Sequence, residues 1–379
     1  MRYCKHTQWL GLSLDEGDTF LQNTDRLHTL LEDLPDSANQ RPSLFVFIGN
    51  RSKALAIKEL AKTFSPSPQY GHDPSCQSQH DDNIGRMSQA RLHGRRAHGE
   101  IHLHIHAQSA FSSRPILLAD GDLPSHDRSK RPLAPEKCHE MASRQLNGIS
   151  STLSASADLI YAKLLSPFTD VFCFFAEDVG NFVPIVRRLA LWLDLGQCST
   201  LPKSTRPKVL IITERQFDRP PNDEAGLQVF KQMLSEETTL DVSNLFSDIQ
   251  VLSLASHKMI LSNRSRHREL FEHLLNFSDQ VRDARISTQT LFSAHHFSAF
   301  FGHALHHLLT NFPEPFNFIT TSRINNPVSE NLQDHLKDFI QNIKTPRNLI
   351  DFAVPVIASS FLLDNYPPDM HCQVTASYD

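Results

Sequence analysis

Four stretches of the chain are continuous runs of mostly apolar residues, and they set the first expectation about the fold. Runs of this kind suit β-strands that are buried on both faces, as in a parallel sheet covered by helices. They cover residues 43–49, 170–176, 208–213 and 248–254. Residues 99–106 alternate strictly between polar and apolar positions, which predicts a half-buried strand, and residues 114–120 form a further strand that ends in Asp120.

Helical spacing of apolar residues appears between these runs, at residues 182–195 and 224–236. The resulting order is a strand and a helix, then two strands in succession, then alternating helices and strands. This order predicts an α/β fold with a doubly wound, mainly parallel sheet and one antiparallel hairpin.

The sheet domain is predicted to span residues 41–262 and to be flanked by helical segments. Residues 1–40 are polar, with apolar residues at helical spacing from Leu21 to Leu34 and with Asn23 or Thr24 as a helix cap. Residues 263–371 are predicted to form an all-helical second domain, followed by a polar tail at 372–379. Two polar stretches, residues 65–98 and 122–150, cannot contribute to a core and predict disordered insertions.

The composition limits the kinds of molecule that the chain is expected to bind. The chain has 379 residues, is 40% apolar and has a formal net charge of −5, so no general attraction to nucleic acid is expected. We find no signal peptide and no apolar run near the length of about 20 residues that spans a membrane. The 6 cysteines include no C-x-x-C pair, which fits reduced thiols in the cytoplasm. We therefore expect a cytoplasmic protein with an unknown protein as its partner.

The turn after the first apolar run has the context of a phosphate-binding loop, which joins a strand to a helix with the sequence G-x-x-x-x-G-K-[ST]. Counted from Gly49, the second glycine is Ala54, the phosphate-binding lysine is Leu55 and the magnesium-binding hydroxyl is Ala56. We expect the helix to begin at Ile57. Leucine and alanine cannot offset phosphate charge or coordinate magnesium, so this loop has lost its chemistry.

Other residues of the turn define the candidate nucleotide site. Asn50, Arg51, Ser52 and Lys53 follow Gly49 directly, and Lys53 precedes the motif position by two residues. The site is completed by Asp120 and Thr213, because each ends a predicted strand. Ligands of open α/β sheets bind at the carboxyl ends of the strands. GTP and Mg²⁺ are the cofactors that this site would hold, although the lost groups predict that no cofactor is bound.

Taken together, these segments resemble the Ras-like P-loop GTPases, which implies a Ras-like sheet. In that family the third strand ends in D-x-x-G, and here Asp120 is followed by Gly121, Asp122 and Leu123. The fifth strand leads to [NT]-K-x-D, and here Thr213 is followed by Glu214, Arg215 and Gln216. The resemblance therefore implies a degenerate copy in which the groups that hold the γ-phosphate and guanine are absent.

The chain also resembles the N-terminal GTPase-like module of large filamentous-fungal proteins, some of which continue into a patatin-like phospholipase domain. The matching segments are residues 100–104, 114–120, 170–178, 206–214 and 352–371. The chain ends before any patatin-like domain, so the resemblance implies a truncated paralogue.

The histidine side chains are candidates for a metal site. His102, His104 and His106 are spaced by two, so they project from one face of the predicted strand, and such an array can bind zinc. The alternative is an ordinary strand side in a chain with 21 histidines. His303 and His307 face the same way on a predicted helix, where a packing or surface role competes with metal binding.

Three hypotheses about function follow. The first is a pseudo-GTPase: a degenerate P-loop protein that acts as an interaction or regulatory module and has no catalytic residues. The second is an active GTP- or ATP-binding hydrolase with a non-standard loop. The third is a metal-binding protein that uses the strand with His102, His104 and His106.

Overall fold

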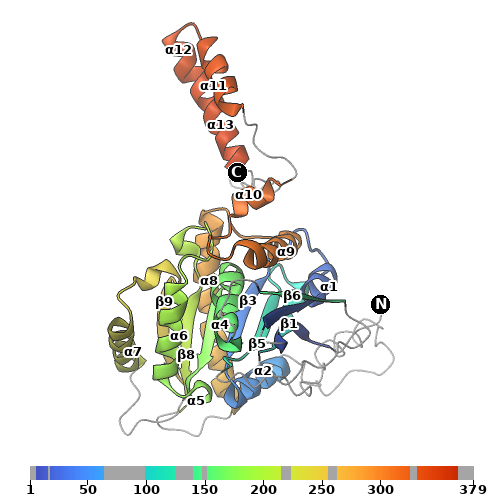
Figure 1. The fold of residues 1–379 in the computed structure, drawn as a ribbon, viewed down its shortest axis with the longest axis vertical. Helices are drawn as coiled ribbons and strands as arrows, with labels where there is room; N and C mark the ends of the chain where they lie inside the picture. The colour runs from blue at the N-terminus through green and yellow to red at the C-terminus, as the bar shows by residue number, and fades with distance from the viewer. Residues whose placement is uncertain are drawn as a thin grey trace, which may run out of the picture.

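A computed structural model describes residues 6–15, 18–63, 99–124, 140–146, 152–214, 223–254, 263–324 and 331–365. Its centre is one sheet with helices on both faces, and a helical hairpin near the C-terminus extends away from this body (Figure 1). The strands are β1 (Gln8–Asp15), β2 (Asp18–Thr24), β3 (Ser43–Ile48), β4 (Ile101–Ile105), β5 (Ile116–Gly121), β6 (Met141–Gln145), β7 (Val171–Phe175), β8 (Lys208–Thr213) and β9 (Asp248–Ser253).

The nine strands of the described residues form one mixed sheet in the order β6-β2-β1-β4-β5-β3-β7-β8-β9. Parallel pairing joins β5, β3, β7, β8 and β9. Antiparallel pairing joins β6, β2, β1, β4 and β5. The prediction of a Ras-like, mainly parallel sheet is therefore wrong, because half of the pairings between these strands are antiparallel.

The additional antiparallel strands come from segments in which no strand was predicted. β1 and β2 lie in the N-terminal segment that was expected to be helical, and β6 lies inside the second predicted insertion. In β2, Thr19 and Leu21 are buried two residues apart, so Leu21 follows the period of a strand there. The helix there, α1 (Arg26–Glu32), is shorter than predicted, and its N-cap residue is Asp25, not Asn23 or Thr24.

The strands predicted from continuous apolar runs are confirmed at the centre of the sheet, where every residue of β3, β7 and β8 is buried. The alternation of residues 99–106 is also confirmed, because β4 buries Ile101 and Leu103 and pairs antiparallel with β5. The cause is the same in both cases: strands covered on two faces need apolar residues throughout, whereas a half-covered strand needs them at every second position.

Helices cover the two faces of the sheet with separate apolar cores. The helices of the described residues, besides α1, are α2 (Arg51–Thr63), α4 (Leu153–Leu159), α5 (Ala176–Val179), α6 (Phe182–Asp194), α7 (Asp223–Glu237), α8 (Asn263–Ser287), α9 (Ala294–Asn311), α10 (Phe318–Ser322), α11 (Leu332–Gln341), α12 (Pro346–Asn348) and α13 (Val354–Asn365), of which the last three form the hairpin away from the sheet. The larger core joins one face of the sheet to α1, α4, α6, α7 and α9. The smaller core joins the other face to α2 and α8.

The shorter segments are mostly single turns. The 3₁₀ turns are η2 (Ser109–Phe111), η4 (Ser166–Phe168), η5 (Lys203–Thr205) and η6 (Val242–Asn244), and the π-helical segments are η3 (Ile160–Leu165) and η7 (Leu349–Ala353).

The predicted C-terminal helices are present, but α8 and α9 belong to the two cores of the sheet. α8 contributes Leu270, Leu274 and Phe277 to the smaller core, and α9 contributes Phe297 and Phe301 to the larger one. The boundary at residue 262 between a sheet domain and a helical domain stays a prediction. Residues 65–98, most of 122–150 and the tail at 372–379 lie outside the described residues.

Candidate functional site

The turn after β3 is shorter than the sequence motif predicts. α2 begins at Arg51, so only Gly49 and Asn50 separate it from the strand. Leu55 and Ala56 consequently lie in the second turn of the helix, with Leu55 exposed and Ala56 buried in the smaller core. The prediction that the helix begins at Ile57 is wrong, because residues 51–56 include no glycine or proline to delay it.

The first turn of α2 is capped by a carboxylate from elsewhere in the fold. Asp178, in α5 just after β7, accepts hydrogen bonds from three backbone N–H groups: those of Asn50 at 2.7 Å, Ser52 at 3.0 Å and Lys53 at 3.0 Å. The first N–H groups of a helix lack partners within the helix and carry its positive dipole end, so they attract an anion. Asp178 is therefore the anion of this site.

Gly49 is required by this close approach. A Cβ atom on residue 49 would lie 2.8 Å from Oδ2 of Asp178 and 3.0 Å from Cβ of Phe175. The glycine of the predicted phosphate loop thus makes room for the capping carboxylate.

Lys53 is directed toward the neighbouring strand and not toward the turn. Its Nζ forms an ion pair with Asp120 and donates a hydrogen bond to the carbonyl of Gly121 at 2.7 Å. The side chain is buried at 1% exposure. The predicted proximity of Gly49 and Asp120 is confirmed, because β3 and β5 are parallel and pair Ile48 with Gly121. Lys53 consequently neutralises Asp120 inside the protein.

Two further carboxylates lie beside the capped turn. Ser52 Oγ donates to Glu214 at 3.1 Å, and the backbone N–H of Glu214 donates to Glu177 at 2.8 Å. Burial raises the pKa of the Glu214 carboxyl, and the charges of Glu177 and Asp178 raise it further, against the lowering effect of the bond from Ser52. Negative charge thus already crowds this end of the sheet.

The remaining predicted site residues take different positions. Arg51 is the exposed first residue of α2, and Asn50 Nδ2 donates to the carbonyl of Asp178 at 3.4 Å. Thr213 is buried at the end of β8, where its carbonyl accepts from the N–H of Leu254 at 2.9 Å. Thr213 thus reaches the turn only through its neighbour Glu214.

Asp178, Glu177 and Glu214 were not predicted as site residues. The available signal was their position: each follows a buried strand, β7 or β8, whose carboxyl end lies at the same edge as that of β3. An acid at that place can contact a helix N-terminus across the edge, but the sequence does not specify which acid does so.

The histidines on β4 are held by neighbouring groups. His102 Nδ1 lies 2.8 Å from Thr7 Oγ1, and its Nε2 lies 3.2 Å from Glu100 Oε2. Burial lowers the pKa of His104 to about 4, and burial also lowers the pKa of His106 to about 4. The ring of His106 lies 5.4 Å from that of Phe271 on α8. His102 would have to give up one of its two contacts to bind a metal.

The second histidine group lies on α9, where His307 Nε2 contacts the carbonyl of Glu314 at 2.9 Å. His303 is exposed and lines a groove of about 480 Å³ between α1 and α9, together with His28, His295 and His306. No group of three or more His, Cys, Asp or Glu side chains within the described ranges is arranged to hold a metal ion.

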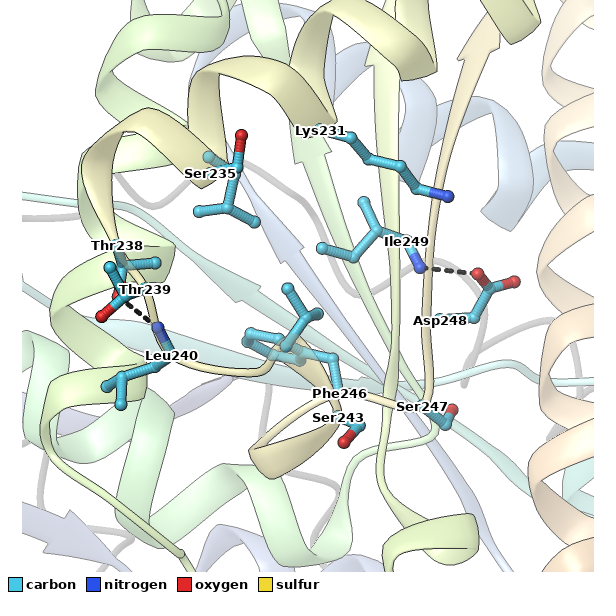
Figure 2. A pocket seen from close by; sticks show the side chains of 12 residues that line it. Lys231, Ser235, Thr238, Thr239, Leu240, Ser243, Phe246, Ser247, Asp248 and Ile249 are labelled. Carbon is cyan, nitrogen blue, oxygen red and sulfur yellow. Dashed lines mark hydrogen bonds between the residues drawn. The ribbon is translucent and has the colours of Figure 1, made fainter.

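A pocket of about 470 Å³ lies beside β9 (Figure 2). It is formed where α7 ends and β9 begins, with Phe246 and Ile249 as its apolar floor and Lys231 and Asp248 at its rim. Asp248 is the first residue of β9, so the pocket is at the amino end of a strand whose carboxyl end borders the site edge. None of the predicted site residues lines it.

Comparison of the whole chain with protein family models and with curated proteins gave no match. In the part of the chain that the structure describes, no helix is both long and apolar enough to cross a membrane.

Proposed function

We propose that this chain is a degenerate P-loop protein that does not turn over nucleotide and acts as an interaction or regulatory module. The observation that carries the proposal is the Asp178 carboxylate, which accepts three N–H groups at the start of α2. In a working phosphate loop, backbone N–H groups at this place cradle phosphates. Here the same kind of donor is used to hold the protein together.

Electrostatics supports the same conclusion. A phosphate entering the turn would have to displace Asp178 and approach the carboxyl groups of Glu177 and Glu214. Of the two basic residues at the turn, Lys53 pairs with Asp120 inside the protein, and Arg51 is exposed. Phosphoryl transfer depends almost entirely on placed positive charge and magnesium, so the turn lacks what the reaction requires.

The resemblance to the fungal GTPase-like module fits this proposal as its evolutionary origin, because a degenerate copy can keep a turn and lose its ligand. A cytoplasmic location is part of the proposal. Cys173 and Cys198 are free thiols buried in the fold, which suits a reducing compartment.

Equilibrium binding of labelled GTP and ATP to the purified chain, with and without Mg²⁺, tests the proposal. We expect no saturable binding and no hydrolysis above buffer. Asp178→Gly frees the three N–H groups, so this variant is expected to bind pyrophosphate weakly and without a need for Mg²⁺. The matched control is Glu177→Gly, which makes the same replacement one residue earlier and leaves the cap in place.

Two outcomes would overturn the proposal. Mg²⁺-dependent hydrolysis by the unmodified chain, abolished by Lys53→Ala, would establish an active nucleotide hydrolase. Failure of a folded Asp178→Gly variant to bind pyrophosphate would show that Asp178 does not block an anion site.

A further inference from the structure

The segment from α11 to α13 forms a helical hairpin, here called the C-terminal hairpin, that extends away from the sheet (Figure 1). Among its described side chains, residues 331–360, only that of Ala353 is buried. The rings of Phe339 on α11 and Phe352 on η7 lie 6.2 Å apart. The hairpin therefore has almost no core of its own.

Several large apolar side chains of the hairpin are exposed among its polar ones. Ile350 is 65% exposed and Phe352 is 57% exposed, which is unusual for residues of this size. The exposed large apolar side chains are those of Leu332, Ile340, Leu349, Ile350, Phe352, Val354 and Val356, and all but Leu332 lie near the tip or on the second arm. Together these side chains present apolar surface on the order of 500–600 Å², which is as large as the largest patch of a typical monomer.

This apolar surface surrounds the second arm of the hairpin. Ile350, Phe352 and Val354 are two residues apart, so successive side chains lie on roughly opposite sides of the helix. Residues 352–360 include no charged residue. A helix that is apolar on all sides needs cover on all sides, and α11 can cover only one.

We propose that a second copy of this chain provides the missing cover, by pairing two C-terminal hairpins into an antiparallel four-helix bundle. This inference names a partner for the interaction module proposed above and rests on that proposal. A two-fold pair buries at most this patch on both copies, on the order of 1,000–1,200 Å² in total, which is the size of a weak or transient interface. Short paired helices of this kind are the usual components of such bundles.

Charge favours the antiparallel arrangement. The tip of the hairpin carries Lys344 and Arg347, whereas α11 carries Asp334, Lys337 and Asp338 and has a net charge of −1 with its histidine neutral. Arg347 also pairs with Asp351 at 3.2 Å within its own helix. An antiparallel pair places the basic tip of each copy beside the acidic α11 of the other. It also places the two bodies at opposite ends of the bundle, because each hairpin extends away from its own body (Figure 1).

The molar mass of the full chain in solution, measured by light scattering and sedimentation equilibrium, tests this inference. At roughly 10–100 µM, the range that suits an interface of this size, we expect a mass approaching twice that of one chain. The double variant Ile350→Asp with Val354→Asp is expected to weaken the dimer at least tenfold and leave the thermal unfolding of the body unchanged. The matched control is Leu191→Asp with Val229→Asp, at exposed apolar positions on α6 and α7, and its mass should equal that of the unmodified chain.

A charge exchange tests the orientation. Lys344→Glu with Arg347→Glu, or Asp334→Lys with Asp338→Lys, should each weaken the dimer, and the combination of all four should restore it. The inference is wrong if the unmodified chain stays a monomer throughout this range, or if the Ile350→Asp, Val354→Asp variant dimerises as well as the unmodified chain. Monomers that bind phosphatidylcholine–phosphatidylserine vesicles through the hairpin would assign this surface to a membrane instead. Nucleotide binding is measured separately, so either proposal can fail without the other.

Discussion

Strand β7 is preceded by Asp170 and followed, in α5, by Asp178, and the two carboxylates are used in different ways. Asp170 is completely buried at the amino edge of the sheet, where Arg285 of α8 donates to it at 2.6 Å and Ser278 Oγ also donates. Asp178 is half-buried at the carboxyl edge and is held by the N–H groups that begin α2. One acid thus has a full charge as its partner, and the other has the dipole end of a helix.

This difference separates an edge of the sheet that only stabilises the fold from an edge whose backbone N–H groups are able to bind an anion. A buried ion pair fixes α8 to the sheet, and nothing small can replace Arg285 from solution. A helix N-terminus has no such preference and accepts any anion that fits. The carboxyl edge is closed only because this chain supplies its own anion.

The largest expected effect is at the buried pair. Asp170→Asn leaves Arg285 charged and without its buried partner, so we expect the free energy of unfolding to fall by about 3–5 kcal/mol. Denaturant unfolding at neutral pH measures it. Asp279→Asn is the control, because Asp279 pairs with Arg114 from an exposed position and its loss should cost under about 1 kcal/mol. Equal losses in the two variants would contradict the assignment.

The second effect is a pH dependence of the free energy of unfolding that comes from His106, near the same amino edge of the sheet. The pKa of His106 falls from 6.5 to about 4 on burial. Between pH 6.5 and pH 4 the unfolded chain takes up a proton that the folded chain excludes. The free energy of unfolding is therefore highest above pH 6.5 and decreases as the pH falls below that value. Between pH 7.5 and pH 5 we expect the unmodified chain to lose about 2 kcal/mol more of its free energy of unfolding than the variant His106→Phe loses. Identical pH profiles of unfolding for the variant and the unmodified chain would contradict this.

A smaller loss is expected at the carboxyl edge. Asp178→Asn keeps the shape of the side chain but removes its charge and one of its two acceptor oxygens. Helix caps of this kind contribute about 1–2 kcal/mol. Denaturant unfolding again measures the loss, with Glu177→Gln as the control because Glu177 contacts only one backbone N–H among the bonds described above. If the control lost as much stability as Asp178→Asn, the cap would not be the cause.

The smallest effect is at Glu214, whose contribution to the free energy of unfolding depends on pH in the opposite direction to that of His106. The pKa of Glu214 is raised, chiefly by burial, so the folded chain holds a proton that the unfolded chain has released. The stability from this group is present at low pH and is lost as pH rises from 4.5 through the raised value. We expect Glu214→Gln to raise the free energy of unfolding at pH 7.5 by under about 1 kcal/mol and to leave it nearly unchanged at pH 4. A gain at pH 4 that equals the gain at pH 7.5 would rule out this origin.

The sequence predicted the elements that local pattern determines. The apolar runs of β3, β7 and β8 and the alternation of β4 are visible without a structure, because burial on two faces or one leaves a direct pattern in the sequence. β2 was missed because Leu21 was grouped with the helical spacing of the leucines that follow it, and β1 was missed although Leu10, Leu12 and Leu14 alternate as in a strand. Counting along the motif from Gly49 predicted Leu55 at the phosphate-binding position. In the structure α2 begins at Arg51, so Leu55 lies in the helix and not in the turn.

The candidate site was predicted only in part, for a different reason. Gly49, Lys53 and Asp120 could be grouped because parallel strands meet at one edge. The cap could not be predicted, since Ser52 and Asp178 lie 126 positions apart and only tertiary pairing brings them together. Whether Lys53 points to a ligand or to Asp120 depends on that pairing too.

The cap also links the order of folding to the pairing of the sheet. Asp178 reaches the start of α2 only when β7 lies beside β3, so the cap cannot form in β3 and α2 alone. Until then the first turn of α2 exchanges its amide hydrogens with solvent, and afterwards it is protected together with β7. A contact between residues far apart in the sequence therefore couples the start of α2 to β7.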